Sequence, residues 1–265
     1  MTKVLALCYH DIYSNNDILL SGFNEGGSNL YKIKDYDFEA QLKSLISTKD
    51  IEIILVNQVR DSKSNNKNIL LTFDDGGITS YTKIFPLLEK YGIKGHFFIV
   101  GNKIGKKGFV DANQLREIRS YGHIIGTHSF SHPDNITLLS SMDIKNEWKN
   151  GVKAIEDILG EKITTCSLPN GFNSKIVREK AFQEGLLYLF TSQPTLKVRG
   201  DNSFYIIGRY PVQAHHKNKY IASLSKRNFP TLIKHNILWS IKSVLRSLGG
   251  DTYLLFRKKI LSRRK

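Results

Sequence analysis

The 265-residue sequence predicts an α/β protein built as a distorted, TIM-like (β/α) barrel of seven or eight strands, with a basic helical extension at its C-terminus. Short apolar runs alternate with helical patterns at the spacing of parallel βαβ units. Residues suited to chemistry follow several different strands, as expected where strand ends meet at one barrel mouth. A doubly wound open sheet also fits the alternation, but no glycine-rich phosphate loop follows the first strand. We therefore favour the barrel.

Strands are expected where short runs of largely apolar residues stand between polar turns. Seven runs meet this description: Val4–Tyr9, Ile69–Phe73, Gly95–Val100, His123–Thr127, Ile163–Leu168, Leu186–Thr191 and Phe204–Gly208. The run Ile51–Val56 is a weaker eighth candidate.

Helices are expected between these strands. Apolar residues recur at helical spacing in three segments: 38–46, 144–159 and 176–182. Gly160 and Gly185 follow the last two segments as expected C-terminal caps. Asp111–Gln114 resembles a capping box that opens a shorter helix. Two polar stretches, Ser14–Asn29 and Ser62–Asn68, are expected to be loops.

Most of the formal charge of +15 lies near the C-terminus. Residues 217–265 hold 13 Lys or Arg and one acid, Asp251, which places +12 there and leaves +3 for the preceding residues. The apolar and charged fractions are ordinary for a folded protein. We expect a barrel over residues 1–215 and a basic extension over residues 216–265.

Cys8 and Cys166 are the only cysteines, and both lie in apolar runs. They are expected to be buried free thiols in a reducing compartment rather than a disulfide framework. The apolar stretch near the N-terminus is too short for a signal peptide. No apolar run approaches the roughly 18 residues of a membrane span. These features predict a cytoplasmic protein.

Two adjacent carboxylates, Asp74 and Asp75, follow the run Ile69–Phe73 and precede Gly76-Gly77. Neighbouring strand residues point to opposite sides, but a glycine turn at a strand end lets both side chains reach one site. One carboxylate can then bind a cation while the other accepts a proton. A solvated Asp-Asp-Gly-Gly turn is the alternative.

His128 and His132 stand four residues apart after the run His123–Thr127. Both a metal clip and a surface pair are compatible with this spacing. One carboxylate and two neutral imidazoles leave a fourth position for water, which is the open arrangement of catalytic metal sites. Zn²⁺ suits this mixed set of ligands, and Co²⁺, Ni²⁺ or Fe²⁺ are alternatives.

These segments resemble the polysaccharide deacetylases, the NodB-homology group or carbohydrate esterase family 4. Thr72-Phe73-Asp74-Asp75-Gly76 and His128-Ser129-Phe130-Ser131-His132 match the first two family motifs in full. The segments 85–88 and 92–98 also match, and the resemblance covers about residues 1–212.

The resemblance implies that Asp75, His128 and His132 bind one divalent metal and that Asp74 is the general base. The metal would polarise the N-acetyl carbonyl and the attacking water, and the base would remove the proton of that water. A tetrahedral oxyanion would form beside the cation. The departing amine then needs a general acid.

The position of that acid departs from the common family pattern, which has a Leu-x-His motif on a late strand. Nothing after Phe204 fits this motif well. The first strand instead ends in Leu7-Cys8-Tyr9-His10, which resembles the circularly permuted branch found among exopolysaccharide deacetylases. We therefore expect His10 to be the general acid, with a core or turn histidine as the alternative.

The third motif is also altered. Family members often have Arg-x-Pro-aromatic-Gly, whereas this chain reads Ser167-Leu168-Pro169-Asn170-Gly171. The resemblance places Pro169, Asn170 and Gly171 at the substrate or its oxyanion. The arginine that would orient the base is missing, and Arg209 is the candidate to replace it by pairing with Asp74.

The basic extension carries apolar residues at helical spacing, with basic residues and Trp239 between them: Ile233, Ile237, Ile241, Val244/Leu245 and Leu248. Such a helix can lie on an anionic membrane. We expect residues 231–265 to make a peripheral contact at the inner face of the cell membrane, with packing on the barrel as the alternative. No nucleic-acid recognition module is visible, so nucleic acid is not an expected partner.

The sequence thus predicts a metal-dependent hydrolase that removes N-acetyl groups from N-acetylhexosamine units of a polysaccharide or its lipid-linked precursor. Two alternatives stay open. One is an esterase that removes O-acetyl groups from glycans. The other, suggested by the missing arginine, is a catalytically weak relative that binds glycan.

Overall fold

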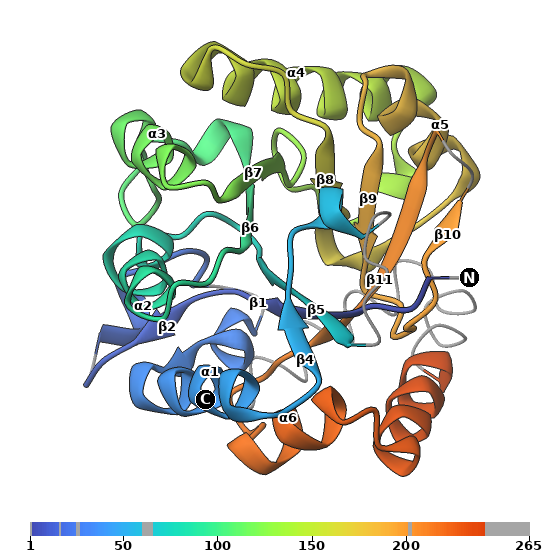
Figure 1. Cartoon of the computed structure of the whole chain (residues 1–265). Helices are drawn as coiled ribbons and strands as arrows, with labels where there is room; N and C mark the ends of the chain where they lie inside the picture. The colour runs from blue at the N-terminus through green and yellow to red at the C-terminus, as the bar shows by residue number, and fades with distance from the viewer. Residues whose placement is uncertain (1, 16, 25–26, 60–65, 201–202, 242–265) are drawn as a thin grey trace.

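The structure is a computed structural model that describes residues 2–15, 17–24, 27–59, 66–200 and 203–241. Within these ranges, seven parallel strands close into a barrel in the order β1–β11–β9–β8–β7–β6–β5, because β5 also pairs with β1 (Figure 1). Their bounds are β1 Leu5–Tyr9, β5 Lys67–Phe73, β6 His96–Ile99, β7 Ile124–Thr127, β8 Thr165–Ser167, β9 Tyr188–Thr191 and β11 Tyr205–Pro211. The predicted (β/α) barrel is confirmed, and each of the seven clear apolar runs forms one strand of the ring.

The other strands of the described residues lie outside this ring. The weaker eighth run forms β4 (Ile51–Ile53), which pairs with the first residues of β5. β10 (Arg199–Gly200) runs antiparallel to β11. β2 (Ile12–Tyr13) and β3 (Ile33–Lys34) form a separate small sheet.

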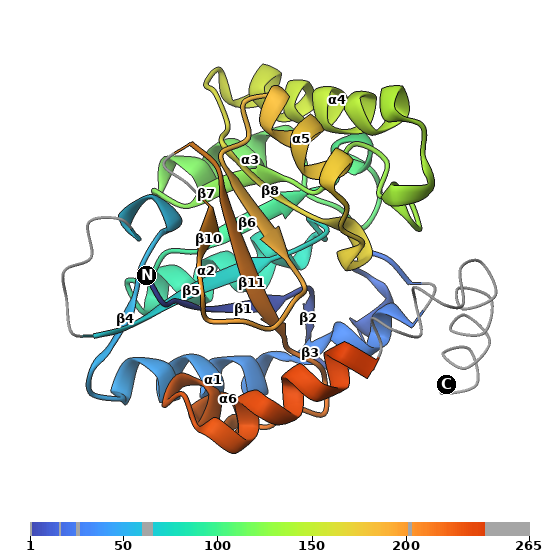
Figure 2. The same cartoon turned by 90° about the vertical axis from the view of Figure 1, so that its right-hand side faces the viewer.

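Helices surround the barrel (Figures 1 and 2). Their bounds are α1 Asp35–Ser47, α2 Phe85–Lys90, α3 Ala112–Ser120, α4 Ser141–Leu159, α5 Lys175–Gln183 and α6 Asn218–Ser225. The shorter turns are η1 Asp17–Leu19, η2 Ser28–Tyr31, η3 Val56–Gln58, the π-turn η4 Ser80–Ile84, η5 Gly101–Lys103, η6 Ile136–Leu138 and η7 Pro169–Gly171. The expected loop Ser14–Asn29 therefore contains short helical turns, and most of the loop Ser62–Asn68 lies outside the described residues.

The helix boundaries follow the predicted capping residues. The Asp111 carboxylate accepts a hydrogen bond from the Gln114 backbone, and the Gln114 side chain accepts one from the Asp111 backbone, both at 2.9 Å. This capping box begins α3. Gly160, with φ of 70°, ends α4 in the left-handed conformation that glycine adopts most easily.

Two of the segments with helical spacing, 38–46 and 176–182, leave some of their apolar residues exposed. Ile46, Ile176 and Phe182 are exposed. On α5 the buried residues are Val177 and Ala181, which lie one helical turn apart and together form its contact with the core. The apolar residues of α5 are spaced so that the helix could turn either Ile176 and Phe182 or Val177 and Ala181 toward the core. The short helix buries only the second pair.

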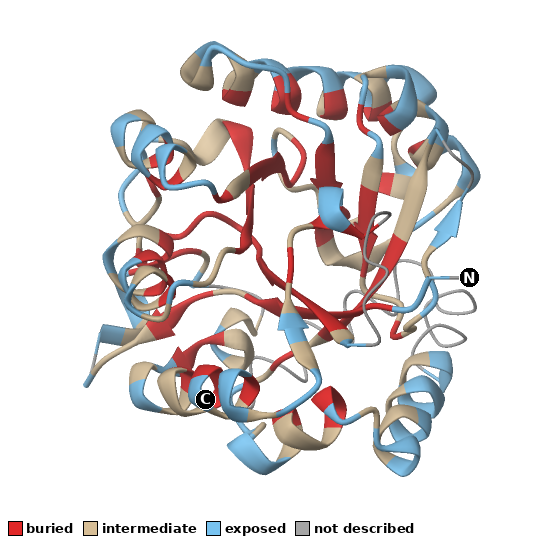
Figure 3. Ribbon diagram, viewed as in Figure 1, coloured by how far each residue is buried: buried red, intermediate tan, exposed pale blue. Residues whose placement is uncertain are grey.

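Side chains on the ring strands alternate between the barrel interior and the surrounding helices, as the two-residue period of a strand requires. On β1, Leu7 belongs to the core shared with the helices, whereas Ala6 belongs to a second buried cluster. That cluster also draws on four other strands: Leu70, Phe98, Phe190 and Ile207. On three of these strands, the residue two positions closer to the carboxyl end than the cluster member is polar or a thiol. These residues are Cys8, Thr72 and Arg209. All three are buried, so the apolar barrel interior is covered by a polar layer. Figure 3 shows that much of the ring strands is buried.

The packed structure extends beyond the expected boundary at residue 215. α6 packs against α1 and buries Ile221 and Leu224 in the core, and both helices lie on the same side of the barrel (Figure 2). Residues 229–241 form a further helix. The expected tail residues after Ile241 lie outside the described ranges. None of the described helices is long and apolar enough to cross a membrane.

Candidate metal centre and its surroundings

The two motifs meet at the carboxyl end of the barrel. The Asp75 Oδ1 atom, just after β5, lies 3.5 Å from His128 Nε2 and 3.7 Å from His132 Nε2, which follow β7. The three ligand atoms lie within 4.8 Å of one another. Nitrogen and oxygen ligands of a tetrahedral ion with bonds of about 2.1 Å stand about 3.4 Å apart. The spacing and chemistry of these residues therefore fit one divalent metal.

Unusual backbone conformations bring these ligands together. Asp75, Ser129 and His132 have φ angles of 77°, 64° and 58°, in the left-handed region. Each such residue costs roughly 1–3 kcal/mol and persists only where its surroundings hold it. The turn at Asp75 lets its side chain and that of Asp74 face one site, although neighbouring strand residues point apart.

The protonation of His128 suits a metal ligand. Its Nδ1 lies 3.0 Å from the Ser167 carbonyl oxygen, which can only accept, so Nδ1 carries the proton and Nε2 faces the carboxylates with a lone pair. Burial lowers the pKa of His128 to about 3 and also lowers the pKa of His132. Both rings are therefore neutral near pH 7, which is the form that binds metals.

A carboxylate on α4 holds the loop between the two histidines. Glu147 Oε2 accepts hydrogen bonds from the backbone N–H groups of Phe130 at 3.1 Å and Ser131 at 2.9 Å. Glu147 Oε1 accepts a third from the Ser131 hydroxyl at 2.6 Å. These bonds tie the position of the His128 and His132 rings to a rigid helix.

Asp74 is held by a buried arginine. Arg209 Nη1 donates to Asp74 Oδ1 at 2.6 Å, and Arg209 Nη2 donates to Asp74 Oδ2 at 2.7 Å. Oδ2 also accepts from Ser167 Oγ at 3.1 Å and from the Cys8 thiol at 3.5 Å. Burial acts to raise the pKa of Asp74, but the Arg209 charge and the hydrogen bonds from Arg209 outweigh it and hold that pKa well below its usual range. The carboxyl group is therefore ionised.

Arg209 itself is fixed on every side. It is fully buried, and its Nη1 donates to Thr72 Oγ1 at 3.2 Å while Nε donates to the Thr191 carbonyl at 3.3 Å. The guanidinium lies 5.7 Å and 6.0 Å from the ring centres of Phe98 and Phe190. The structure thus pairs Arg209 with Asp74 in the geometry expected of a substitute for the missing arginine, and its orienting role stays a prediction.

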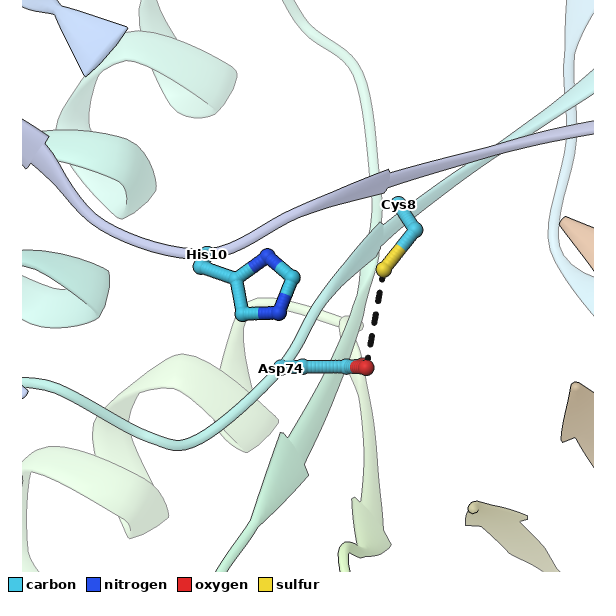
Figure 4. Close-up of side chains that lie close together, drawn as sticks. All are labelled: Cys8, His10 and Asp74. Carbon is cyan, nitrogen blue, oxygen red and sulfur yellow. Dashed lines mark hydrogen bonds between the residues drawn. The ribbon is translucent and has the colours of Figure 1, made fainter. Parts of the chain in front are cut away.

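His10 follows β1 and lies on the same side of the barrel. One of its ring nitrogens, Cys8 Sγ and an Asp74 carboxylate oxygen all lie within 4.8 Å of one another (Figure 4). The His10 ring also packs on Tyr31, with 4.7 Å between ring centres. The structure therefore brings the predicted acid and the predicted base together.

The third motif forms a tight turn, η7, directly after β8. Pro169 is buried, Asn170 has a φ of 53°, and the Gly171 N–H donates to the Leu168 carbonyl at 3.3 Å. The turn thus lies just after Ser167, which contacts Asp74. The assignment of Pro169, Asn170 and Gly171 to substrate stays a prediction.

A buried lysine organises the rim of the site. Lys32 Nζ donates to the carbonyls of Ile18 and Ser21, both at 2.7 Å, and to Asn24 Oδ1 at 2.6 Å. Burial lowers the pKa of Lys32, against the opposing charges of Asp11 and Asp75. These bonds anchor the segment that carries the neighbouring Phe23.

Phe23 covers one of the proposed metal ligands. Its ring centre lies 4.9 Å from that of His132 and 5.3 Å from that of Phe109. Lys103 Nζ stands over both phenyl rings, at 5.4 Å and 5.8 Å from their centres. All three side chains are partly exposed, so an aromatic and cationic surface lies next to His132.

Sequence reasoning did not single out Cys8, Ser167, Glu147, Lys32 or Phe23. A signal existed for Cys8, because it stands two residues before His10 on the same face of a strand. No sequence motif marks the contacts between loops and helices, and it is through such contacts that Glu147, Lys32 and Phe23 act.

Comparison with known proteins follows this geometry. A profile of the family described as Polysaccharide deacetylase matches residues 61–189. The putative polysaccharide deacetylase YxkH of Bacillus subtilis is 26% identical over 217 residues, which cover 79% of this chain and 71% of that protein. The peptidoglycan-N-acetylglucosamine deacetylase PgdA of Listeria monocytogenes is 33% identical over 128 residues, or 48% of this chain. That match spans 26% of PgdA.

Two solved structures share the fold. IcaB from Ammonifex degensii superposes with a TM-score of 0.71 at 20% identity, over 85% of this chain and 98% of that one. The deacetylase PplD from Streptococcus pyogenes, solved in complex with acetate, superposes with a TM-score of 0.69 at 20% identity, over 82% and 95% of the two chains.

Proposed function

Because the chain belongs to the polysaccharide deacetylase family, we propose that it is a metal-dependent hydrolase that removes N-acetyl groups from N-acetylhexosamine units of a polysaccharide or its lipid-linked precursor. The observation that carries this proposal is the cluster of Asp75, His128 and His132 beside the Asp74–Arg209 pair. It supplies three metal ligands and a separate ionised carboxylate, which is the set that amide hydrolysis by an activated water requires.

Each residue has a distinct role in this mechanism. A divalent ion, Zn²⁺ by the ligand set, would supply Lewis acidity to the acetyl carbonyl and to the attacking water. Asp74 accepts the proton of that water. Its Oδ2 accepts three hydrogen bonds, whereas Oδ1 accepts only that of Arg209 among the described residues. Oδ1 therefore has a lone pair left for the water.

His10 acts as the general acid. A histidine that gives its proton to the departing nitrogen lets the amine leave in neutral form. A ring nitrogen of His10 lies within 4.8 Å of an Asp74 carboxylate oxygen, which supports roles for both residues at one reacting carbon. The partly exposed rings of Phe23 and Phe109 offer an apolar surface to the face of a sugar ring.

The Asp74–Arg209 pair favours an active enzyme over a weak glycan-binding relative. The hypothesis of a weak glycan-binding relative depended on the missing arginine that orients the base. Arg209 donates a hydrogen bond to each carboxylate oxygen of that base, Asp74. An O-acetyl esterase remains the second candidate, because a bound ion polarises an ester carbonyl in the same way.

One experiment tests the proposal: metal content and acetate release measured together, on N-acetylglucosamine oligomers and on O-acetylated glycan. We expect one divalent ion per chain and acetate release from the N-acetylated substrate. Asp75→Ala, His128→Ala and His132→Ala should lose the ion, since two remaining ligands hold it poorly. Asp74→Asn should keep the ion but lose activity. Release from the O-acetylated glycan alone would favour the esterase.

We also propose a peripheral contact between the helical segment 229–241 and an anionic membrane at the inner face of the cell membrane. Thr231 and Leu232 attach this segment to the protein, while Ile237, Leu238 and Ile241 are about half exposed. Exposed apolar residues in a strongly basic part of the chain suit an anionic lipid surface.

Binding to phosphatidylglycerol vesicles tests this contact. Ile237→Ser with Ile241→Ser should weaken cosedimentation, and added salt should weaken it in the wild type. Leu138→Ser with Met142→Ser, at exposed positions elsewhere, is the matched control. If the full-length protein does not cosediment with the vesicles at low salt, the membrane contact is ruled out.

A further inference from the structure

A second group of potential ligands lies beside the proposed metal centre. Cys8 Sγ, a ring nitrogen of His10 and a carboxylate oxygen of Asp74 lie within 4.8 Å of one another. Figure 4 shows the three side chains converging from β1 and from the end of β5. The group is distinct in composition, because it contains a thiol and shares no residue with the cluster of Asp75, His128 and His132.

The spacing within this group matches that of a bound ion. Cys8 Sγ lies 3.5 Å from Asp74 Oδ2. A tetrahedral ion bonded to sulfur at about 2.3 Å and to oxygen at about 2.1 Å sets those ligand atoms about 3.6 Å apart. An ion can therefore take the place of the thiol proton between these atoms with little movement of either side chain.

The third ligand is also available. His10 Nδ1 is buried and has no hydrogen-bond partner in the part of the chain that the structure describes. An imidazole free of such bonds can turn to present a nitrogen to an ion. One thiolate, one imidazole and one carboxylate form a mixed set in which sulfur favours soft ions.

We propose that Cys8, His10 and Asp74 form a second cation site, which takes a thiophilic divalent ion such as Cd²⁺ or excess Zn²⁺ and inhibits the enzyme when filled. On binding, the thiol releases its proton to solvent and the thiolate bonds to the ion. Inhibition follows because the ion occupies the general base and the general acid together. The inhibition rests on the proposed function, whereas the binding does not.

Arg209 limits the strength of this site. Its guanidinium pairs with both oxygens of Asp74, so an arriving cation meets a positive charge and competes for the carboxylate. No such pair engages Asp75 among the described residues. The second site therefore fills only after the first, at higher ion concentration.

The test is a Cd²⁺ titration of the metal-loaded protein, followed by equilibrium dialysis and by the ultraviolet band of a cadmium–thiolate bond. The first site contains no sulfur, so this band reports a thiolate outside it, and the two cysteine variants identify which one. We expect the wild type to hold two equivalents of metal in total and to show the cadmium–thiolate band. Cys8→Ala should hold one equivalent in total and should not show the band. Cys166→Ala, which removes the other buried free thiol, should behave like wild type.

Activity gives an independent reading of the same site. The Cd²⁺ concentration that halves acetate release should rise at least tenfold in Cys8→Ala and stay unchanged in Cys166→Ala. Cys8→Ser, which is closer in size, serves if the alanine variant fails to fold. A band that persists without Cys8, or a wild type that binds no second equivalent, overturns the site. An inactive protein that shows the band would instead contradict the proposed function alone.

Discussion

Arg209 and Asp74, 135 residues apart in the chain, form a two-point ion pair inside the barrel, with bonds of 2.6 Å and 2.7 Å. Arg209 comes from β11 and Asp74 follows β5, and only β1 stands between these strands in the ring. The pair holds the predicted base ionised in a buried place, where burial by itself would favour its protonated form.

Removing the arginine should therefore change the pH dependence of activity. In Arg209→Gln, burial raises the pKa of Asp74 unopposed by the guanidinium, so the base becomes protonated at higher pH and the acid limb of kcat/KM moves upward. The lost partner should also lower the free energy of unfolding by about 3–5 kcal/mol. A pH–rate profile and urea denaturation measure the two effects. Arg178→Gln on α5 is the control, and an unmoved acid limb in Arg209→Gln would contradict the role.

His10→Ala should retain the metal and slow amide hydrolysis more than ester hydrolysis. An amine needs a proton to leave, whereas the leaving group of an activated aryl ester does not. General acid catalysis typically contributes about 10²- to 10⁴-fold, so we expect a loss of that size on the amide alone. The measurement compares kcat on both substrates. Equal losses on the two would show that His10 is only structural.

Glu147→Ala should weaken metal binding although Glu147 is not a ligand. The variant frees the backbone of Phe130 and Ser131, so His128 and His132 lose their fixed separation. Residues that orient metal ligands typically contribute about 10- to 100-fold in affinity. Competition with a chromophoric chelator measures this change. Asp157→Ala, an exposed carboxylate on the same helix, should leave the affinity unchanged, and the same affinity in both variants would contradict the role of Glu147.

Gly77→Ala should destabilise the protein through a steric clash. A Cβ atom at this position would stand 2.1 Å from Asp11 Oδ1 and 2.6 Å from Ser21 Oγ. Forcing an extra methyl group into a packed site typically costs about 1–3 kcal/mol, and urea denaturation would register this loss. An unchanged free energy of unfolding would mean that the side chains of Asp11 and Ser21 move aside at little cost.

Local sequence patterns were enough to predict a barrel, the seven apolar runs that form its ring and the two motifs that carry the proposed ligands. These are local patterns: an apolar run predicts a strand, and Asp74-Asp75 or His128-x-x-x-His132 stands out within a few residues. The same locality explains why the spacing of α5 does not show that only Val177 and Ala181 are buried, and why packing beyond residue 215 is not visible in the sequence. Burial of Val177 or Ile221 depends on which neighbour covers each helix.

The surroundings of those motifs depend on the tertiary fold. The sequence offers Arg209 only as a candidate partner for Asp74, and the two residues come into contact because β11 and β5 lie on either side of β1. The approach of Cys8 to Asp74 and the packing of Phe23 on His132 join segments far apart in the chain. Closure of the ring places strand ends side by side whatever their separation in sequence, so contacts across the barrel mouth follow from the fold rather than from any motif.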